Sequence, residues 1–343
     1  MASPSSGVPS DQLRGDRRMA VQDPAAEGTL VVDLVSRPSR RLPSLSLERQ
    51  ESLWGYVFIS PWILGFLAFT LLPMIASAVL SLTNFDPRYP DTIRFIGLAN
   101  YERMLSDPNV GTALLVTVKF AAIMLPASII VALGVAMLVN HPLLIGRNVF
   151  RTLFYMPMQI PIVASTLIWQ WVLNLHVGWV NYALGAVGIS PGPNWLNDEF
   201  WVYPGLTLMA IWGIGNMMLI FLAGLQGVPT ELYEAAVVDG AGRWQRFRNV
   251  TLPMISPVMF YNVIIGLIAT FQYFTQAFVL TNGRGDPNNA TLFFNLNLYR
   301  EGWKYYDMGY AAALAWLLFV IVLGITIVLF ATRRRWVYES NSR

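Results

Sequence analysis

Neutral polar side chains interrupt two long apolar stretches of the sequence, and their types suit ligand binding rather than bond chemistry. On a helix, residues three or four apart share a face. Three such pairs occur here: Trp212 with Asn216, Thr270 with Tyr273, and Gln272 with Gln276. The last two pairs lie on largely different sides of the same predicted helix, so only one of them is expected to line a cavity. Amides and hydroxyls beside aromatic rings suit a sugar, whose hydroxyls need hydrogen-bond partners and whose C–H faces pack on rings.

These polar groups have two possible roles. Polar side chains are costly in hydrocarbon, so those that are kept there often mark a transport pathway. Hydrogen bonds between neighbouring membrane helices are the alternative. The sequence alone leaves both roles open for all five candidate solute contacts, which are Trp212, Asn216, Thr270, Gln272 and Tyr273.

The side chains that most often carry enzymatic or metal chemistry are nearly absent. The 343 residues include no cysteine, which excludes thiolate metal sites, disulfides and cysteine nucleophiles. The two histidines, His141 and His176, lie in separate segments, so we expect no metal site. Neither lysine, Lys119 or Lys304, follows a glycine, whereas a P-loop ATPase needs a Gly-Lys pair. The chain is therefore expected to be non-catalytic and to bind no cofactor itself.

The composition indicates a membrane protein. The chain is 55% apolar and 13% charged, with a mean hydropathy of +0.48, whereas soluble domains carry about 25% charged residues. About 20 helical residues cross the hydrocarbon core, and continuous rather than alternating apolar character favours helices over barrel strands. The predicted fold is an all-α polytopic membrane protein with six transmembrane helices, near 56–82, 112–139, 153–174, 203–226, 256–280 and 309–331.

The positive charges predict the orientation. With the N-terminus inside, the inner segments hold 16 Lys and Arg residues and the outer loops hold six. Since the cytoplasmic side carries the excess, both termini are expected to be cytoplasmic. Residues 1–52 are rich in Ser, Pro, Arg and Asp, which predicts a disordered cytoplasmic tail. A six-helix transmembrane body is expected over 53–335, and a short cytoplasmic tail is expected over 336–343. The positive charge of the chain does not require a nucleic-acid partner.

The loop over 228–254 is the most informative segment. Thr230 is expected to cap a short helix, and Asp239-Gly240 to end it. Leu252-Pro253 then leads into the fifth stretch. Two alanines, Ala235 and Ala236, would let another surface approach closely. The pattern predicts a helix, a turn and a second helix at the cytoplasmic surface, either as a docking element or as a connector lying on anionic lipid.

This loop resembles the EAA loop of ABC-importer permeases. Glu234-Ala235-Ala236 is followed by three residues, Gly240, nine residues and Val250-Thr-Leu252-Pro253. The family pattern is Glu-Ala-Ala, three residues, Gly, nine residues and Ile-x-Leu-Pro, so Val250 is the one departure. Further segments within about 52–335 resemble the carbohydrate-uptake branch of this family, and the chain is similar to its maltose-type and glycerol-phosphate-type permeases. These segments are 58–63, 95–102, 150–157, 221–226 and 281–283.

The resemblance implies a set of partners. Two homologous permeases would form a heterodimeric pore in a bacterial or archaeal cytoplasmic (inner) membrane. A dimeric ABC ATPase carrying ATP and Mg would bind beneath, and an extracytoplasmic binding protein would deliver the sugar. The residues implied to couple to the ATPase are Glu234, Ala235, Ala236, Asp239, Gly240, Leu252 and Pro253. The helices that flank the loop are also where maltose-type permeases place sugar contacts, at distances from the motif similar to those of Asn216, Thr270 and Tyr273.

Ion-coupled secondary transport and a channel are the alternatives. A proton- or sodium-coupled carrier normally places acidic groups in mid-membrane, and no Asp or Glu lies inside the six stretches. Lys119 is the only ionisable residue there, and we expect it to snorkel or pair locally. A solute phosphate would favour cationic residues at the cavity, so a neutral di- or oligosaccharide is preferred.

Overall fold

The computed structural model describes residues 47–338, which are helical apart from turns and one isolated bridge between Thr83 and Phe95. The predicted N-terminal tail, 1–52, therefore lies mostly outside the described residues, and so does most of the predicted C-terminal tail, 336–343. The first helix, α1 (Leu47–Phe66), begins within the last residues assigned to that tail. The chain divides into two units, 1–61 and 62–343, and the division falls inside α1.

Four helical segments of the described chain are individually long and apolar enough to cross a membrane: Glu48–Leu80, Pro108–Asn140, Ser256–Thr281 and Met308–Arg335. They coincide with four of the six predicted stretches. Glu48–Leu80 contains α1, the π-helical turn η1 (Leu67–Leu71) and α2 (Leu72–Leu80). The segments Pro108–Asn140 and Met308–Arg335 correspond to α4 (Pro108–Asn140) and to α16 (Met308–Thr332) with η6 (Arg333–Arg335).

The other two predicted stretches are bent pairs of helices. The first pair, Arg147–Gln159 and Ile162–Val172, bends by 101° at Pro161, and the second, Val202–Trp212 and Gly215–Gln226, bends by 58° at Gly213. Counting each bent pair as one span gives six candidate membrane spans among the described residues. The pairs comprise α5 (Arg147–Tyr155), η3 (Met156–Gln159), α6 (Ile162–Val172), α8 (Val202–Trp212) and α9 (Gly215–Gln226).

The spans predicted over 153–174, 203–226 and 256–280 therefore contain breaks. A residue before proline is held out of helical conformation, which accounts for the break at Ile160-Pro161. The fifth stretch is also interrupted, because α13 (Ser256–Phe271) ends three residues before α14 (Thr275–Thr281) begins. Apolar composition predicts the length of these stretches but not their breaks.

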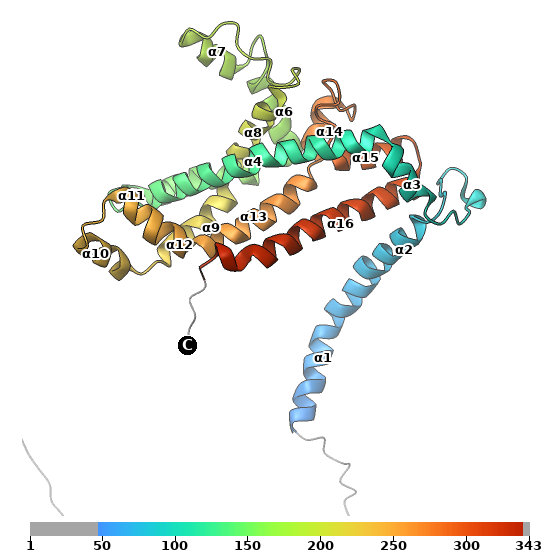
Figure 1. Ribbon diagram of the computed structural model, residues 1–343, viewed down its shortest axis with the longest axis horizontal. Helices are drawn as coiled ribbons and strands as arrows, with labels where there is room; N and C mark the ends of the chain where they lie inside the picture. The colour runs from blue at the N-terminus through green and yellow to red at the C-terminus, as the bar shows by residue number, and fades with distance from the viewer. Residues whose placement is uncertain (1–46, 339–343) are drawn as a thin grey trace, which may run out of the picture. The chain divides into compact units, whose positions relative to one another are not determined.

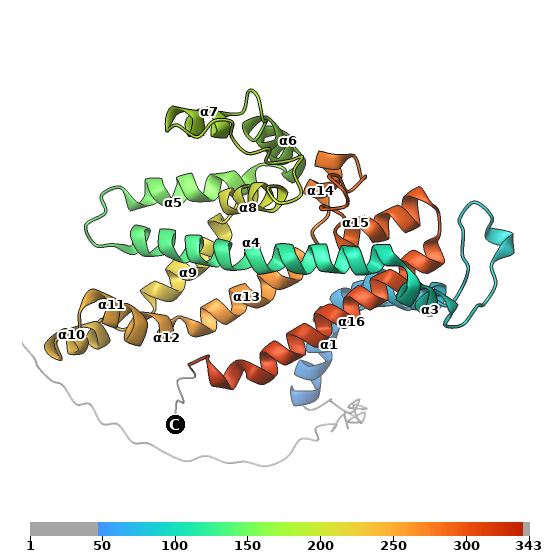
Figure 2. The same cartoon turned by 45° about the horizontal axis from the view of Figure 1, so that its top comes forward.

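Helices α4, α13 and α16 lie side by side in the second unit, and α4 also packs along α8 and α9 (Figures 1 and 2). Gly215 allows α9 to begin directly against the backbone of α5, since a Cβ there would overlap Phe154 and Tyr155. Shorter elements complete the described chain: η2 (Pro90–Thr92), α3 (Ala99–Ser106), α7 (Trp179–Ala186), α10 (Thr230–Val238), α11 (Arg243–Arg246), η4 (Phe247–Thr251), α12 (Leu252–Met254), α15 (Phe294–Tyr299) and η5 (Arg300–Lys304).

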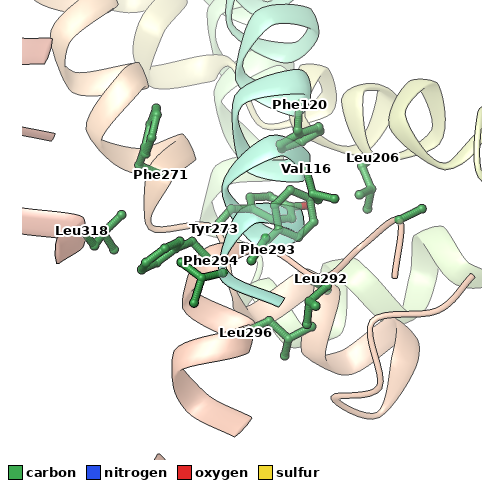
Figure 3. Packing of buried hydrophobic residues seen from close by; sticks show 14 of the residues in the cluster. Val116, Phe120, Leu206, Phe271, Tyr273, Leu292, Phe293, Phe294, Leu296 and Leu318 are labelled. Carbon is green, nitrogen blue, oxygen red and sulfur yellow. The ribbon is translucent and has the colours of Figure 1, made fainter. Parts of the chain in front are cut away.

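Two apolar clusters hold the helices together. The larger one surrounds the rings of Phe120, Tyr273 and Phe293, which belong to three separate parts of the sequence (Figure 3). The smaller one contains Phe221 of α9 and Ile255 between α12 and α13, and Tyr233 of α10 packs against it. The smaller cluster therefore lies directly beneath the loop that carries the Glu-Ala-Ala motif.

Candidate functional site

The short helix α10 is ended by a glycine in the left-handed conformation. Gly240 has φ +76°. Its N–H donates to Val237 O at 3.0 Å, and the N–H of Ala241 donates to Ala236 O at 2.8 Å. This pair of bonds is the Schellman arrangement, which favours glycine at the left-handed residue. The predicted stop at Asp239-Gly240 is confirmed.

The predicted start of this helix is wrong in one respect. Thr230 is the first helical residue rather than the cap, and the capping position is occupied by Pro229, which makes no side-chain capping bond. The extended conformation that Pro229 adopts is sufficient to redirect the chain into the helix. Glu231 lies in the first turn, where a negative charge suits the positive end of the helix dipole.

One face of α10 is presented to the surroundings. Glu234, Ala235 and Asp239 are exposed, and Ala236 is half-buried. Apolar side chains stand beside them, with Val237 and Val238 exposed by 54% and 87%. The free surface of this short helix therefore combines carboxylates, small residues and bare apolar side chains.

The opposite face of α10 is anchored to the segment that follows it. The Tyr233 hydroxyl lies 3.0 Å from Thr251 Oγ1. After the Gly240 turn, Gln245 Oε1 accepts from Gly242 N at 2.7 Å and so caps α11. The chain then continues helically through η4 and α12, where Leu252 and Pro253 lie, to α13. The predicted helix, turn and second helix are all present.

A pocket of about 260 Å³ lies among α4, the break between α8 and α9, and α13. Asn216, at the start of α9, lines it, and its side-chain amide makes no hydrogen bond to any of residues 47–338. Asn262 also lines it and donates to Val258 O at 3.1 Å. The other lining residues are Met124, Leu125, Ser128, Ala210, Gly213, Ile214, Met217, Ile220, Tyr261, Ile265, Gly266 and Ala269.

The other four predicted solute contacts lie elsewhere in this conformation. Trp212 packs edge-on against Trp169 at a centroid distance of 5.9 Å. Thr270 is fully buried and donates to Gly266 O at 2.7 Å. Gln272 lines a separate pocket that α15 and α16 also border.

Tyr273 is buried within the larger apolar cluster. Its ring centroid lies 4.8 Å from that of Phe120 and 4.8 Å from that of Phe293 (Figure 3). Helix breaks explain why the five candidates separate: Gly213 interrupts the row of Trp212 and Asn216, and the chain leaves α13 at Gln272. Ser128, Tyr261 and Asn262 were not predicted, although Asn262 is an amide inside the fifth apolar stretch.

A charged cluster joins the starts of α4 and α16. Arg103 Nη1 lies 2.6 Å from Asp307 Oδ2, and Nη2 lies 3.6 Å from Glu301 Oε2. Its guanidinium stands 3.8 Å from the centroid of the Tyr310 ring, whose hydroxyl donates to Asp107 Oδ2 at 2.8 Å. Burial raises the pKa of the Glu301 carboxyl despite the neighbouring arginine. About 200 residues of sequence separate the partners, so no local pattern indicates this cluster.

Lys119 is exposed on α4, and no ion pair links it to another residue of the part of the chain that the structure describes. A long amphipathic side chain can direct its ammonium group toward the headgroups. In a helix the Cα–Cβ bonds tilt toward the N-terminus. Snorkelling of Lys119 toward the start of α4 stays a prediction.

Several known proteins are similar to this chain in sequence or in fold. A probable ABC transporter permease protein, YesP of Bacillus subtilis, is 40% identical over 85% of this chain and 94% of its own. The trehalose/maltose transport system permease protein MalF of Thermococcus litoralis is 34% identical over 82% of this chain and 94% of its own. A chain in the crystal structure of a bacterial alginate ABC transporter, bound to an alginate-loaded periplasmic protein, matches the fold with a TM-score of 0.70. That match has 24% identity and covers 84% of this chain and 96% of the other.

A family model described as the inner membrane component of binding-protein-dependent transport systems matches residues 124–336. The matched range starts within α4 and extends through the EAA-like loop to the end of α16. It covers more than half of the chain, and the relatives extend the similarity toward α1. The chain belongs to the family of binding-protein-dependent transport system inner membrane components.

Proposed function

We propose that the chain is one permease subunit of an ATP-driven importer for a neutral di- or oligosaccharide. The observation that carries this proposal is α10, a short helix with one anchored face and one exposed face that mixes carboxylates with bare apolar side chains. Such a surface suits a protein partner, since aromatic and apolar residues are enriched at the centre of interfaces. Relatives whose names specify trehalose, maltose, lactose or arabinooligosaccharides support a sugar as the cargo.

In this proposal α10 is the coupling helix. Glu234 and Asp239 supply polar contacts to an ATPase subunit, Ala235 and Ala236 allow close approach, and Gly240 provides the turn. Leu252 and Pro253 start the helix that continues to α13. Movement of the ATPase would therefore be passed from α10 through η4 and α12 to a helix that lines the pocket of Asn216. The chain would perform no bond chemistry, and ATP with Mg would bind to the separate ATPase.

The solute pathway is proposed to pass the pocket of Asn216. Its free amide can donate to and accept from sugar hydroxyls, and Tyr261, Asn262 and Ser128 provide further polar groups. The volume of about 260 Å³ is close to the lower end of ordinary ligand pockets, and a second permease would complete the wall. Trp212, Thr270, Gln272 and Tyr273 stay predictions for the solute site in another conformation.

The proposed assembly has six spans, both termini in the cytoplasm, a second homologous permease, a dimeric ABC ATPase and an extracytoplasmic sugar-binding protein. The excess of Lys and Arg on the side of the α10 loop supports this orientation. The connections that carry α7 and the residues after α14 would then face outward. The protein would lie in a bacterial or archaeal cytoplasmic membrane, in contact with lipid.

The deciding experiment is uptake by proteoliposomes that contain the complete importer. The binding protein would first be screened against maltose, trehalose, lactose and arabinotriose by thermal shift. Uptake of the radiolabelled sugar is expected to need both the binding protein and internal ATP, and to continue when the proton gradient is collapsed. Uptake that runs without ATP and stops when the gradient is collapsed would instead establish secondary transport.

A further inference from the structure

A second polar pocket lies where α6 packs against α14, and it shares no lining residue with the pocket of Asn216. Its volume is about 420 Å³. It is bordered by the end of α6, the connection between α6 and α8, and the residues that follow α14. Eight of its lining residues have polar side chains: Gln170, Asn174, His176, Asn194, Asn197, Thr281, Arg284 and Asp286. The four apolar ones are leucines 173, 175, 196 and 280.

Three amides that line this pocket are unpaired in the described part of the chain. The side-chain amides of Gln170, Asn194 and Asn197 make no hydrogen bond to residues 47–338. Other asparagine side chains in the same connection make hydrogen bonds to it. Asn174 Oδ1 accepts from His176 N at 2.9 Å and from Val177 N at 3.2 Å. The connection thus contains both structural amides and amides that are free to bind a ligand.

The wall that carries the free amides is held in place by its own bonds. Asn181 Nδ2 donates to Leu175 O at 3.1 Å and to Pro193 O at 3.0 Å, and its Oδ1 accepts from Trp195 Nε1 at 2.7 Å. Asn288 Nδ2 donates to Glu199 Oε1 at 2.8 Å, which ties this connection to the residues after α14. A ligand group would therefore meet donors and acceptors that are already positioned, which lowers the entropy cost of binding.

We propose that this pocket is a sugar-binding subsite on the extracytoplasmic side, separate from the pocket of Asn216. Each carboxamide can both donate to and accept from hydroxyls. The leucines offer an apolar wall to the C–H groups of a sugar ring, and the volume falls within the usual range for small-molecule sites. Sugar released by the binding protein would be retained here before it enters the membrane pathway. The inference rests on the proposed function for its orientation and for the class of ligand.

A loop of the binding protein is the competing occupant. A protein–protein contact typically covers about 800 Å² on each partner, whereas this recess has room for one or two sugar rings. Next to the pocket, α7 carries the exposed side chains of Trp179 and Tyr182, which would suit a protein partner. The free amides are therefore assigned to the sugar, and protein docking is an outcome of the test.

The absence of cysteine from this chain permits a direct test. Asn197→Cys would place a single thiol at the pocket, and Asn109→Cys would place one at an exposed position at the start of α4 as a control. Maleimide labelling of this chain would be followed by mass spectrometry in the assembled importer. Maltose, trehalose, lactose and arabinotriose would each be added without binding protein. Tetraethylene glycol, which has hydroxyls only at its two ends and no sugar ring, would be the control solute.

We expect at least one of these sugars to slow the labelling of Asn197→Cys, by about threefold at twice its dissociation constant, without affecting Asn109→Cys. Protection by unloaded binding protein and by none of the sugars would overturn the subsite in favour of protein docking. A lack of protection by a sugar that the importer transports would overturn it as well. If none of the sugars is transported, the proposed cargo itself is wrong, and this outcome is distinct from transport without protection.

Transport measurements give a second readout. Asn194→Ala combined with Asn197→Ala is expected to lower the sugar taken up per ATP hydrolysed by about fivefold, which corresponds to about 1 kcal/mol. Stimulation of the ATPase by loaded binding protein should stay unchanged, and Asn194→Gln with Asn197→Gln should restore part of the uptake. An equal fall in uptake and ATPase stimulation would indicate a docking role and overturn the proposal.

Discussion

The hydroxyl of Tyr233 on α10 lies 3.0 Å from the hydroxyl of Thr251, one turn before α13 is reached through α12. The bond joins the exposed helix to the segment that continues into a wall of the Asn216 pocket. Tyr233 also packs against the smaller apolar cluster, so its ring and its hydroxyl hold the same two elements together. A displacement of α10 should therefore carry the base of α13 with it.

Tyr233→Phe should weaken this link while it keeps the ring in the cluster. We expect the free energy of unfolding to fall by about 1 kcal/mol, the usual net contribution of one hydrogen bond. The sugar taken up per ATP hydrolysed should fall as well. The measurements are thermal unfolding of the importer in nanodiscs and uptake with ATPase activity in proteoliposomes.

Thr251→Val removes the same bond from the other side and completes a double-mutant cycle. If the two hydroxyls act through each other, the double variant should lose little more than either single variant, with a coupling energy of about 1 kcal/mol. Fully additive losses would show that the bond does not connect α10 to α13.

Gly240→Ala should weaken assembly with the ATPase. The added Cβ would meet open space, so its cost comes from placing alanine at φ +76°, about 1 kcal/mol or slightly more. Because this strain falls on the turn that ends α10, the dissociation constant for the ATPase should rise by about fivefold to tenfold, which corresponds to about 1–1.4 kcal/mol. The measurement is binding of ATPase to permease in nanodiscs.

Gly188→Ala is the matched control for backbone strain. Gly188 has φ +87° and also has open space at the Cβ position, but it follows α7. Its substitution should lower stability by a similar amount and leave ATPase binding unchanged. Equal losses of ATPase binding in both variants would remove α10 from the proposed interface.

The sequence predicted the local structure of the loop over 228–254 more accurately than the positions of the candidate solute contacts, for a physical reason. The ends of α10 depend on local chemistry, because Asp239-Gly240 stops the helix through bonds between neighbouring residues. The only local error was Thr230, where the conformation of Pro229 replaced a side-chain cap. The long apolar stretches were also found, since length and composition alone decide whether a segment can cross a membrane.

The positions of the candidate solute contacts depend on helix breaks and on distant contacts. Assigning Trp212 and Asn216 to one face assumed an unbroken helix, but Gly213 lies within a bend of 58°. Tyr273 was predicted as a solute contact from its polar group and its distance from the motif. In this conformation its ring packs against rings of α4 and of the segment before α15, and its solute role stays a prediction. The link from Arg103 to Asp307 spans about 200 residues and has no local signal.

Asn216→Ala should lower sugar uptake by about tenfold, the effect of losing about 1.4 kcal/mol of hydrogen bonding to the solute. Its amide makes no bond to the described chain, so the variant should fold and bind the ATPase as the wild type does. Asn295→Ala removes a half-buried amide that lines a different pocket and should leave uptake within about twofold. Equal losses in the two variants would place the solute site outside the pocket of Asn216.

Glu301→Gln should change how stability depends on pH. Burial raises the pKa of Glu301 above its ordinary value, so the folded chain binds this proton more tightly than the unfolded chain. The stability contributed by this residue is therefore largest at low pH and is lost as pH rises from the ordinary pKa through the raised one.

The Glu301→Gln variant should have a higher unfolding temperature than the wild type at pH 7, and the difference should shrink toward pH 4, where both side chains are neutral. Asp307→Asn gives the opposite control, because it removes the charge that pairs with Arg103 at 2.6 Å, at a cost of up to about 1 kcal/mol, while asparagine can still cap α16. A lower unfolding temperature of Glu301→Gln at pH 7 would mean that the attraction of Arg103 for Glu301 outweighs the cost of burying the carboxylate.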